Sequence, residues 1–406
     1  MRVMFYCQYV LGIGHWVRSS QIVRALARQS EVLFVNGGVP LPGYEMAPGV
    51  EVVQLPALET SSDFHRLNAP GQTGSVEEVQ QQRKQLLEDL LHRFRPDVVV
   101  IEMFPFGRKR FAGELLPLLE KARTVPKPPR IACSVRDILV AKKNQAAFEE
   151  KACQILNRYF DLVLVHGDSR FQKLDETFSR VNDIRCPVCY SGYVTQPAPV
   201  EQAPFASADR DDLCTSEPCI ITSIGSGRYA TGHLLLENVI EAAGLLGETI
   251  PHRFKIFAGP FVPDAVYDRL HKLALNKPNV ELNKYTPDFQ AMMRRAQLSI
   301  SMGGYNTTMN VLSTGIRALM FPHTANDDQE QIIRARKLKD VGALSVLDLE
   351  DLVPWALAQK ITAALAQQPC PIDINLNGAE VSAGILTRLG QGEDRNASLC
   401  AEAQAQ

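Results

Sequence analysis

The sequence predicts an α/β protein made of two open, parallel β-sheets covered by helices. Short β-rich runs alternate with amphipathic segments, and each alternation is a βα unit whose right-handed repetition gives a parallel sheet. A chain of 406 residues exceeds what a single hydrophobic core organises, so two domains are expected. The alternation stops once near the middle of the chain and then restarts. The predicted fold class is therefore α/β, with two Rossmann-like domains in succession.

Seven strands are expected in the first half, each a short β-rich run. They cover Val3–Gln8, Glu31–Val35, Glu51–Leu55, Asp97–Glu102, Arg130–Ser134, Asp161–His166 and Ile184–Tyr190. Helices fill most of the gaps between them. The clearest covers Ser75–Phe94, where Ser75 and Glu78 form a capping box ahead of a helix whose expected apolar side carries Leu86, Leu87, Leu90 and Leu91.

The interruption covers residues 195–217, which carry prolines, Ala, Ser and a charged Asp-Arg-Asp-Asp stretch without periodicity. This composition indicates a linker or a long surface loop. We therefore expect an N-terminal domain over 1–194, a C-terminal domain over 218–390 and a frayed polar tail over 391–406. The second-half strands are expected at Cys219–Ile224, Arg253–Ala258, Val280–Leu282, Leu298–Ser301, Ala318–Phe321 and Ala343–Val346, with helices at Leu234–Leu246 and Asp351–Gln367.

Composition excludes several classes of protein. The chain has 43 Lys and Arg against 45 Asp and Glu, so it lacks the basic field that recruits nucleic acid. No apolar run approaches the roughly 20 residues that cross a bilayer, and Met1–Tyr9 reads as a strand rather than a secretory signal. Nine scattered Cys suit reduced thiols better than a disulfide framework. We expect a cytoplasmic protein without a nucleic-acid partner.

In open parallel sheets, ligands bind at the carboxyl ends of the strands, so the loops that follow strands are the candidate sites. The first is Gly12-Ile13-Gly14-His15, between strand one and a helix. Its glycines let a ligand approach the backbone, the helix start suits an anion, and His15 has the chemistry of a general base. The alternative is that His15 only caps the helix. Because position 17 is Val, the dinucleotide fingerprint G-x-G-x-x-G is not met, which argues against a dehydrogenase.

Two loops of the second half are candidates for phosphate binding. The first follows the first strand of this half and contains Ser226, Gly227 and Arg228. Glycine amides together with a guanidinium group suit a pyrophosphate. The alternative is a plain turn without a ligand. The second joins the end of a strand to the start of a helix and contains Gly303, Gly304, Tyr305, Asn306 and Thr307, with Asn306 as the expected N-cap. After the next strand, Asn326, Asp327, Asp328, Gln329, Glu330 and Gln331 offer acceptors for sugar hydroxyls, or form only a solvated helix start.

These motifs, in this order, resemble the GT-B glycosyltransferases related to the N-acetylglucosaminyltransferase of peptidoglycan synthesis, the family 28 type. The resemblance covers nearly the whole chain, and Thr314-Gly315, Phe321-Pro322 and Glu330-Gln331 extend it. The chain is also similar to a group of bacterial predicted glycosyltransferases through the segments Met103–Gly107, Arg136–Ile138, Val165–Asp168 and Ser191–Val194.

The resemblance implies a GT-B fold with two domains facing across a cleft. It implies an inverting, metal-independent transferase that needs no cofactor and uses a nucleotide sugar, expected to be a UDP-sugar, as co-substrate. The N-terminal domain would hold the acceptor, with His15 as the base or its close neighbour. The C-terminal domain would hold the donor, and Gly14 of the N-terminal domain would also contact it. The donor-binding residues of the C-terminal domain would be Ser226, Gly227, Arg228, Gly303, Gly304, Tyr305, Asn306, Thr307, Asn310, Glu330 and Gln331. The family usually has Glu as its ribose contact where this chain has Asn310.

Other residues have two interpretations each. Glu102 and Asp137 end predicted strands and either orient His15 or simply meet solvent. Phe104, Phe106 and Phe111, beside Arg108, Lys109 and Arg110, either dock on an anionic membrane or belong to a partly buried loop. Cys186 and Cys189 with Cys214 and Cys219 invite a zinc interpretation, but their positions in predicted strands argue against it.

The fold alone does not choose one activity. Nucleotide-sugar hydrolases and non-hydrolysing epimerases share this architecture, and a non-catalytic nucleotide-sugar sensor is a third class that Asn310 keeps open. Donor turnover without an acceptor would favour the hydrolase, whereas binding without turnover would favour the sensor.

Overall fold

The computed structural model divides the chain into two compact units. Unit 1 combines Met1–Thr195 with Ile374–Gln406, and unit 2 is Gln196–Asp373. The structure describes residues 1–10, 13–41, 45–60, 67–71, 73–196, 217–286, 288–322, 329–368, 372–393 and 399–400. Most of the predicted linker, residues 197–216, lies outside the described residues, as do Gly12, Cys214, Asn326, Asp327 and Asp328.

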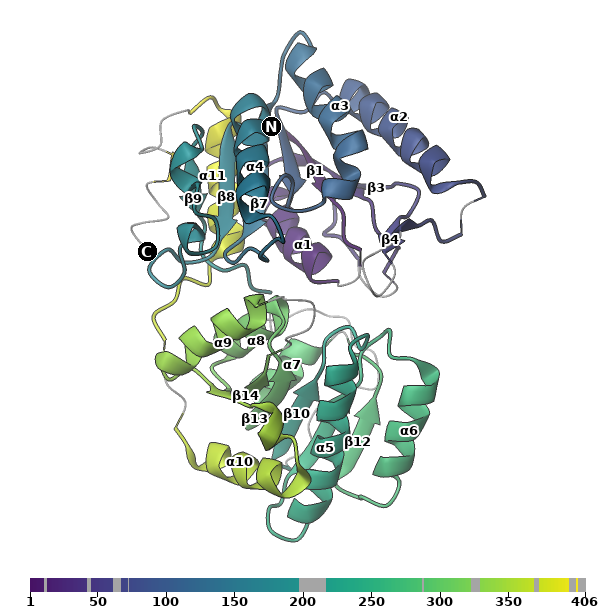
Figure 1. Ribbon diagram of the computed structural model, residues 1–406, viewed down its shortest axis with the longest axis vertical. Coiled ribbons are helices and arrows are strands. Elements are labelled where there is room, and N and C mark those ends of the chain that lie inside the picture. The colour runs from purple at the N-terminus through teal and green to yellow at the C-terminus, as the bar shows by residue number, and fades with distance from the viewer. Residues whose placement is uncertain are drawn as a thin grey trace. The chain divides into compact units, whose positions relative to one another are not determined.

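Unit 1 is built on a seven-stranded parallel sheet, in the order β3-β2-β1-β6-β7-β8-β9 (Figure 1). The strands are β1 (Arg2–Cys7), β2 (Glu31–Asn36), β3 (Val50–Gln54), β6 (Val98–Glu102), β7 (Arg130–Arg136), β8 (Leu162–His166) and β9 (Val188–Tyr190). The seven predicted strands are confirmed, although the last begins at Val188 rather than Ile184. A small antiparallel pair, β4 (Glu59–Thr60) and β5 (Leu67–Asn68), was not predicted.

Helices cover both faces of this sheet because successive strand residues point to opposite sides. Met4 and Tyr6 of β1 pack in one core, and Val3, Phe5 and Cys7 pack in the other. The first core lies under α2 (Val76–Phe94), α3 (Ala112–Thr124) and α4 (Gln145–Tyr159). The second lies under α1 (Gly14–Leu26) and α11 (Gly378–Gly390). The predicted capping box is confirmed, since Glu78 N–H donates to Ser75 Oγ at 3.2 Å while Glu78 accepts from Ser75 N–H at 2.8 Å.

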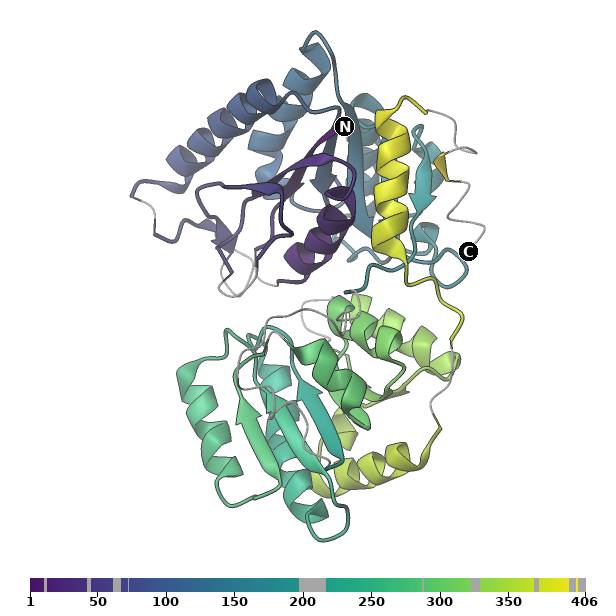
Figure 2. The same ribbon diagram turned by 180° about the vertical axis from the view of Figure 1, so that it is seen from behind.

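The assignment of residues up to 390 to the C-terminal domain was wrong for residues 374–390, which belong to unit 1. Figure 2 shows α11, in yellow, against the sheet of unit 1. Ile385, Leu386 and Leu389 are fully buried there. Gly378 begins α11 close to the backbone of Gly192, where a Cβ would lie 2.5 Å from Gly192 O. The apolar face of α11 is therefore buried by a sheet that lies far away in the sequence.

The predicted frayed tail and the predicted reduced thiols also need correction. Leu399 is fully buried, and Cys400 forms a disulfide with Cys189 of β9, with a Cα–Cα distance of 5.3 Å. These two described residues of the tail are fixed to unit 1, whereas 394–398 and 401–406 lie outside the described residues. Cys189 is therefore not a zinc-binding thiolate in this structure.

Unit 2 has a six-stranded parallel sheet in the order β12-β11-β10-β13-β14-β15. Its strands are β10 (Cys219–Ser223), β11 (Arg253–Phe257), β12 (Val280–Asn283), β13 (Leu298–Met302), β14 (Arg317–Phe321) and β15 (Ser345–Val346), which confirms the six predicted strands. Its helices are α5 (Ala230–Leu246), α6 (Asp264–Ala274), α7 (Phe289–Arg295), α8 (Tyr305–Thr314), α9 (Glu330–Asp340) and α10 (Pro354–Ala366). Helices α5 and α10 pack on the main apolar core of this unit. Strand β13 points Leu298 and Ile300 toward that core and buries its serines, Ser299 and Ser301, on the opposite face of the sheet.

Each sheet has one point at which the strand order reverses. In unit 1 it lies between β1 and β6, and in unit 2 between β10 and β13. At such a point the connections leave on opposite sides, and the carboxyl ends of the two strands open a crevice where ligands bind in α/β sheets. Within the described part of the chain, none of the helices is both long and apolar enough to span a membrane.

Candidate active site

The switch point of unit 1 brings together His15 and Glu102, two of the predicted site residues. Gly14 is the first residue of α1, and His15 follows it in the first turn. Glu102 is the last residue of β6 and is fully buried. His15 Nδ1 lies 2.6 Å from Glu102 Oε1, and 13% of the His15 side chain is exposed. The ring is therefore held by a strand-end carboxylate, and the alternative that His15 only caps the helix does not describe this contact.

The partners of the two ring nitrogens define the tautomer of His15. Nδ1 faces a carboxylate oxygen, which accepts hydrogen bonds, whereas Nε2 lies 3.1 Å from Nη2 of Arg136, which can only donate. A neutral ring with its proton on Nδ1 satisfies both partners. In that form Nε2 carries the lone pair, and it is the atom that can take a proton from a hydroxyl group.

Two further guanidinium groups lie beside Glu102. Arg18, one helical turn after His15, donates to Glu102 Oε1, and its side chain is 1% exposed. Arg108 Nη2 lies 3.9 Å from Glu102 Oε2. Burial alone would raise the pKa of Glu102, but His15, Arg18 and Arg108 outweigh burial and lower the pKa to about 2. Glu102 is therefore ionised at neutral pH.

The same surroundings keep the His15 ring neutral. Burial is the largest cause and lowers the pKa of His15 to about 3; Glu102 opposes this effect, and the positive charges of Arg108 and Arg136 add to it. Because the ring is neutral, Nε2 is ready to act as a base, although a low pKa makes it a weak one.

The loop after β6 carries Arg108 to this site. Met103 (φ 66°) and Arg108 (φ 59°) adopt left-handed backbone conformations, which are unfavourable for residues with a Cβ and are found where the surrounding structure fixes them. Phe104, Phe106 and Phe111 of this segment are each 2% exposed. Of the two interpretations of this segment, membrane docking is wrong for the three rings, because they fill the core of unit 1.

Asp137, the other predicted helper of His15, has a different partner. Its carboxylate is fully buried and accepts a hydrogen bond of 2.8 Å from the hydroxyl group of Tyr193. Tyr193 N–H in turn donates to Asn375 O at 2.7 Å, in the segment that leads into α11. Asp137 thus lies among the contacts that hold residues 374–378 on unit 1.

In unit 2, the loop that follows β10 contains Ser226, Gly227 and Arg228. Gly227 has φ 82°, and a Cβ there would lie 2.4 Å from Ala258 O, so only glycine fits against the loop after β11. His233 Nε2 donates to Gly227 O at 2.7 Å. The Arg228 guanidinium lies over the ring of Phe261, 4.4 Å from its centre, and the Arg228 residue is exposed. Loop packing thus requires Gly227, while Arg228 carries an exposed charge on the loop that follows β10.

The neighbouring loop leads from β13 into α8. Gly304 is the N-cap, so the prediction of Asn306 as N-cap was wrong, and the helix begins at Tyr305. A Cβ at Gly304 would meet nothing within 4 Å, and the first turn has no acidic residue. At the start of an α-helix the first N–H groups point out of the helix and create a positive end, which here lies at Gly304 and Tyr305.

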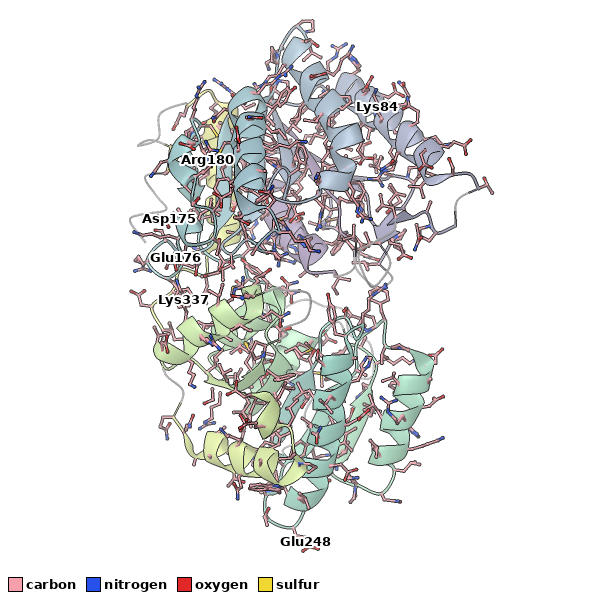
Figure 3. The ribbon with its side chains drawn as sticks, in the orientation of Figure 1. Lys84, Asp175, Glu176, Arg180, Glu248 and Lys337 are labelled. Atoms are coloured by element: carbon pink, nitrogen blue, oxygen red, sulfur yellow. A yellow bond between two sulfur atoms is a disulfide. The ribbon has the colours of Figure 1, made fainter. Side chains whose placement is uncertain are left out.

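Residues at the start of α9 lie against this turn. A Cβ at Gly303 would lie 3.4 Å from Gln331, and Glu330 pairs with the buried Arg334 at 3.0 Å. Arg334 also lies 5.2 Å from the centre of the Tyr305 ring. Figure 3 shows the labelled Lys337 on this same helix. Asn310 lies on α8 as predicted and is half-buried.

The prediction missed the roles of the three arginines around the His15–Glu102 pair: Arg18 and Arg108 beside Glu102, and Arg136 beside His15. Arg18 lies three residues after His15, a spacing that places both side chains on one face of a helix and could have indicated the contact. Arg108 and Arg136 had no comparable signal, because a loop conformation and the register of β6 with β7 place them.

Similar solved structures define the fold of the protein. CalG4, the calicheamicin glycosyltransferase, matches 100% of this chain and 98% of its own with a TM-score of 0.56 and 19% identity. A putative UDP-N-acetylglucosamine 2-epimerase from Listeria monocytogenes matches 97% and 98% with a TM-score of 0.63 and 12% identity. These identities show the fold alone. Together with the two parallel sheets, they show that the chain has the GT-B fold.

Sequence comparison relates part of the chain, within unit 2, to one glycosyltransferase family. Residues 235–373 match the glycosyltransferase family 28 C-terminal domain, so unit 2 is of the family 28 type, as the motifs predicted. The UDP-N-acetylglucosamine--N-acetylmuramyl-(pentapeptide) pyrophosphoryl-undecaprenol N-acetylglucosamine transferase of Rhodopseudomonas palustris (strain BisB18) is 32% identical over 102 residues, 25% of this chain and 26% of that relative. The match therefore spans about a quarter of the length of the curated relative.

Proposed function

We propose that the protein is an inverting glycosyltransferase that moves a sugar from a nucleotide sugar to an acceptor hydroxyl. The observation that carries the proposal is the contact of His15 with Glu102, which leaves the lone pair of His15 on Nε2. A base in this state takes the proton of the acceptor hydroxyl while the acceptor oxygen attacks the anomeric carbon. The bond from that carbon to the diphosphate breaks, and its electron pair leaves with the nucleoside diphosphate.

Unit 2 is proposed to bind the donor, as a UDP-sugar. The family 28 domain supports this assignment, because the matched relative is named for a UDP-N-acetylglucosamine donor. The loop that carries Arg228 and the start of α8 both offer positive charge at the switch point, where a diphosphate leaving group would be stabilised. The cytoplasmic location stays a prediction from the sequence.

Epimerization is the second candidate, because two UDP-N-acetylglucosamine 2-epimerase structures match at TM-scores of 0.60 and 0.63. An epimerase would convert the donor without an acceptor, and a hydrolase would release the free sugar. A thermal-shift panel of nucleotides and nucleotide sugars tests the shared premise of all three enzymes. A ligand at 100 times its dissociation constant should add about 2.7 kcal/mol of stability. If no nucleotide sugar raises the melting temperature, the donor assignment is wrong.

Replacing Arg228 by alanine should weaken the binding of a nucleoside diphosphate more than that of the nucleoside alone. The reason is that an exposed guanidinium next to a glycine-rich turn can form charge-assisted hydrogen bonds with phosphate oxygens. Calorimetric titration of both ligands measures the two losses. Arg269→Ala, which removes an exposed arginine of α6, is the matched control and should change neither affinity. Equal losses for both ligands would place Arg228 away from the phosphates.

Asn310→Glu should tighten the binding of ribonucleotide sugars. A carboxylate accepts from both ribose hydroxyl groups, whereas a carboxamide offers one acceptor oxygen. Hydrogen bonds to a charged group contribute about 1.5–3 kcal/mol against 0.5–1.5 for neutral ones, so the affinity gain could reach roughly tenfold. A 2′-deoxy donor should gain less, and Asn238→Glu on α5 is the control. An unchanged ribose affinity, or an equal gain for both donors, would show that Asn310 is not the ribose contact.

Turnover should survive exhaustive chelation with EDTA. The sequence shows no D-x-D carboxylate pair in a plausible site loop, and helix N-termini with Arg228 can balance the phosphate charge. The check is the initial rate with and without the chelator. Metal independence would be refuted by a rate that EDTA abolishes and that Mg²⁺ or Mn²⁺ restores.

A further inference from the structure

The proposed base of unit 1 is covered by an arginine. Nε2 of His15, which would receive the acceptor proton, lies 3.1 Å from Nη2 of Arg136. While Arg136 donates to the lone pair of Nε2, the same lone pair cannot accept a proton from a hydroxyl group. A productive acceptor must therefore displace this guanidinium from Nε2.

Arg108 lies beside the same group and has donors to offer. Its Nε and Nη2 are buried and form no hydrogen bond to any described residue, and Nη2 remains 3.9 Å from Glu102 Oε2. Nε and Nη2 form the side edge of a guanidinium, the edge that binds two oxygens of one carboxylate or phosphate. A buried donor without an acceptor is unfavourable, and an incoming oxyanion would satisfy it.

The charges near His15 also favour an anion. Arg18 and Arg108 share the single carboxylate of Glu102, whose Oε1 already accepts from both His15 and Arg18. Burial lowers the pKa of His15, and the positive charges of Arg108 and Arg136 lower it further. Burial likewise lowers the pKa of Arg108, and the charge of Arg136 adds to that effect. Like charges held together in a buried place are stabilised when an opposite charge lies between them.

We infer that the acceptor carries an oxyanion, a phosphate or carboxylate group, which binds Arg108 and Arg136 next to His15 and draws Arg136 away from Nε2. This inference rests on the proposed function and names the class of its acceptor. Arg136 is then a specificity-determining residue, since it leaves the base covered until an anionic acceptor arrives. Neutralising the two guanidinium charges also makes Nε2 a stronger base at the moment when it is needed.

The experiment follows the ring nitrogens of His15 by NMR in the full chain with ¹⁵N-labelled histidine, and His15→Gln identifies the signals. Inorganic phosphate and acetate are the two probes, which separate a phosphate from a carboxylate preference. We expect one or both to move the Nε2 signal of His15 in a saturable way. The Arg108→Gln variant below separates phosphate bound at this site from phosphate bound elsewhere, because only the former should lose its effect on the signal.

Three variants sharpen the result. Arg108→Gln should raise the dissociation constant of the probe at least about tenfold, as expected for a lost charge-assisted hydrogen bond. Arg136→Gln should show, without any probe, an Nε2 signal displaced from that of the unliganded wild type. Lys109→Gln, which removes an exposed charge from the same loop, should stay within about twofold of wild type.

The inference is overturned if neither probe moves the His15 signal of the wild type, an arm that needs no variant to fold. It is also overturned if Arg108→Gln, with a melting temperature near that of wild type, binds the probe unchanged. The thermal-shift panel with nucleotide sugars reports separately on the donor. A protein that binds a nucleotide sugar but no oxyanion at His15 would keep the proposed function and lose this inference.

Discussion

His15→Ala should lower turnover by a factor on the order of 10² to 10⁴, while donor affinity changes little. This range is what a positioned general base contributes to catalysis. In the structure the His15 ring contacts Glu102 and Arg136 of unit 1, whereas the proposed donor loops belong to unit 2. The loss should therefore appear in the rate of the chemical step rather than in donor binding.

Steady-state kinetics and donor titration of the same preparations measure the two quantities. The control is His92→Ala, which removes an exposed histidine near the end of α2 and should leave turnover within about twofold of wild type. Full turnover by His15→Ala would remove His15 from the mechanism.

Glu102→Gln should lower turnover by a similar factor and also destabilise unit 1. A carboxamide keeps the shape of the side chain but no longer carries the charge that fixes the proton on Nδ1 of His15. It also leaves Arg18 and Arg108 without the carboxylate that balances them. Removing one partner of a buried ion pair costs about 3–5 kcal/mol, because the other charge stays buried.

Two measurements separate these effects: the turnover number at a temperature where the variant is folded, and the free energy of unfolding from denaturant titration. Glu120→Gln on α3 removes an exposed carboxylate and should change each measurement little. A Glu102→Gln enzyme with unchanged turnover would show that the His15–Glu102 contact has no part in the reaction.

Local features of the fold were predictable from the sequence. The strands are short apolar runs, and the start of α2 is encoded within four residues by Ser75 and Glu78. The order of the motifs likewise indicated the family 28 type, which the match over 235–373 confirms. Such signals are contained in neighbouring residues, so no tertiary contact is needed to recognise them.

Features that depend on distant partners were not predictable. Helix α11 has an ordinary amphipathic sequence, and nothing near Gly378 indicates that its partner is the sheet of unit 1. The disulfide between Cys189 and Cys400 joins residues 211 positions apart. The glycine-rich turn at 303–304 indicated a helix start, but only the backbone conformation shows that Gly304, rather than Asn306, is the N-cap.

The site was predictable in part for the same reason. A histidine after strand one and a carboxylate at a strand end could be read from the sequence, and the structure brings His15 and Glu102 into contact. Which charged residues surround that contact depends on the pairing of β6 with β7 and on the left-handed conformation of Arg108. The sequence left Arg108 with two interpretations, on a membrane-docking surface or in a partly buried loop, and the structure places it beside Glu102.

The most direct test of the central claim is product analysis of the wild-type protein with the nucleotide sugar that raises its melting temperature most. ¹H NMR of the reaction, with a panel of hydroxyl-bearing acceptors, follows the anomeric proton of the sugar and the released nucleoside diphosphate. We predict that both changes depend on an acceptor and that the new glycoside has the opposite anomeric configuration to the donor. Release of free sugar, or epimerization of the donor, at the same rate without any acceptor would contradict the glycosyltransferase assignment.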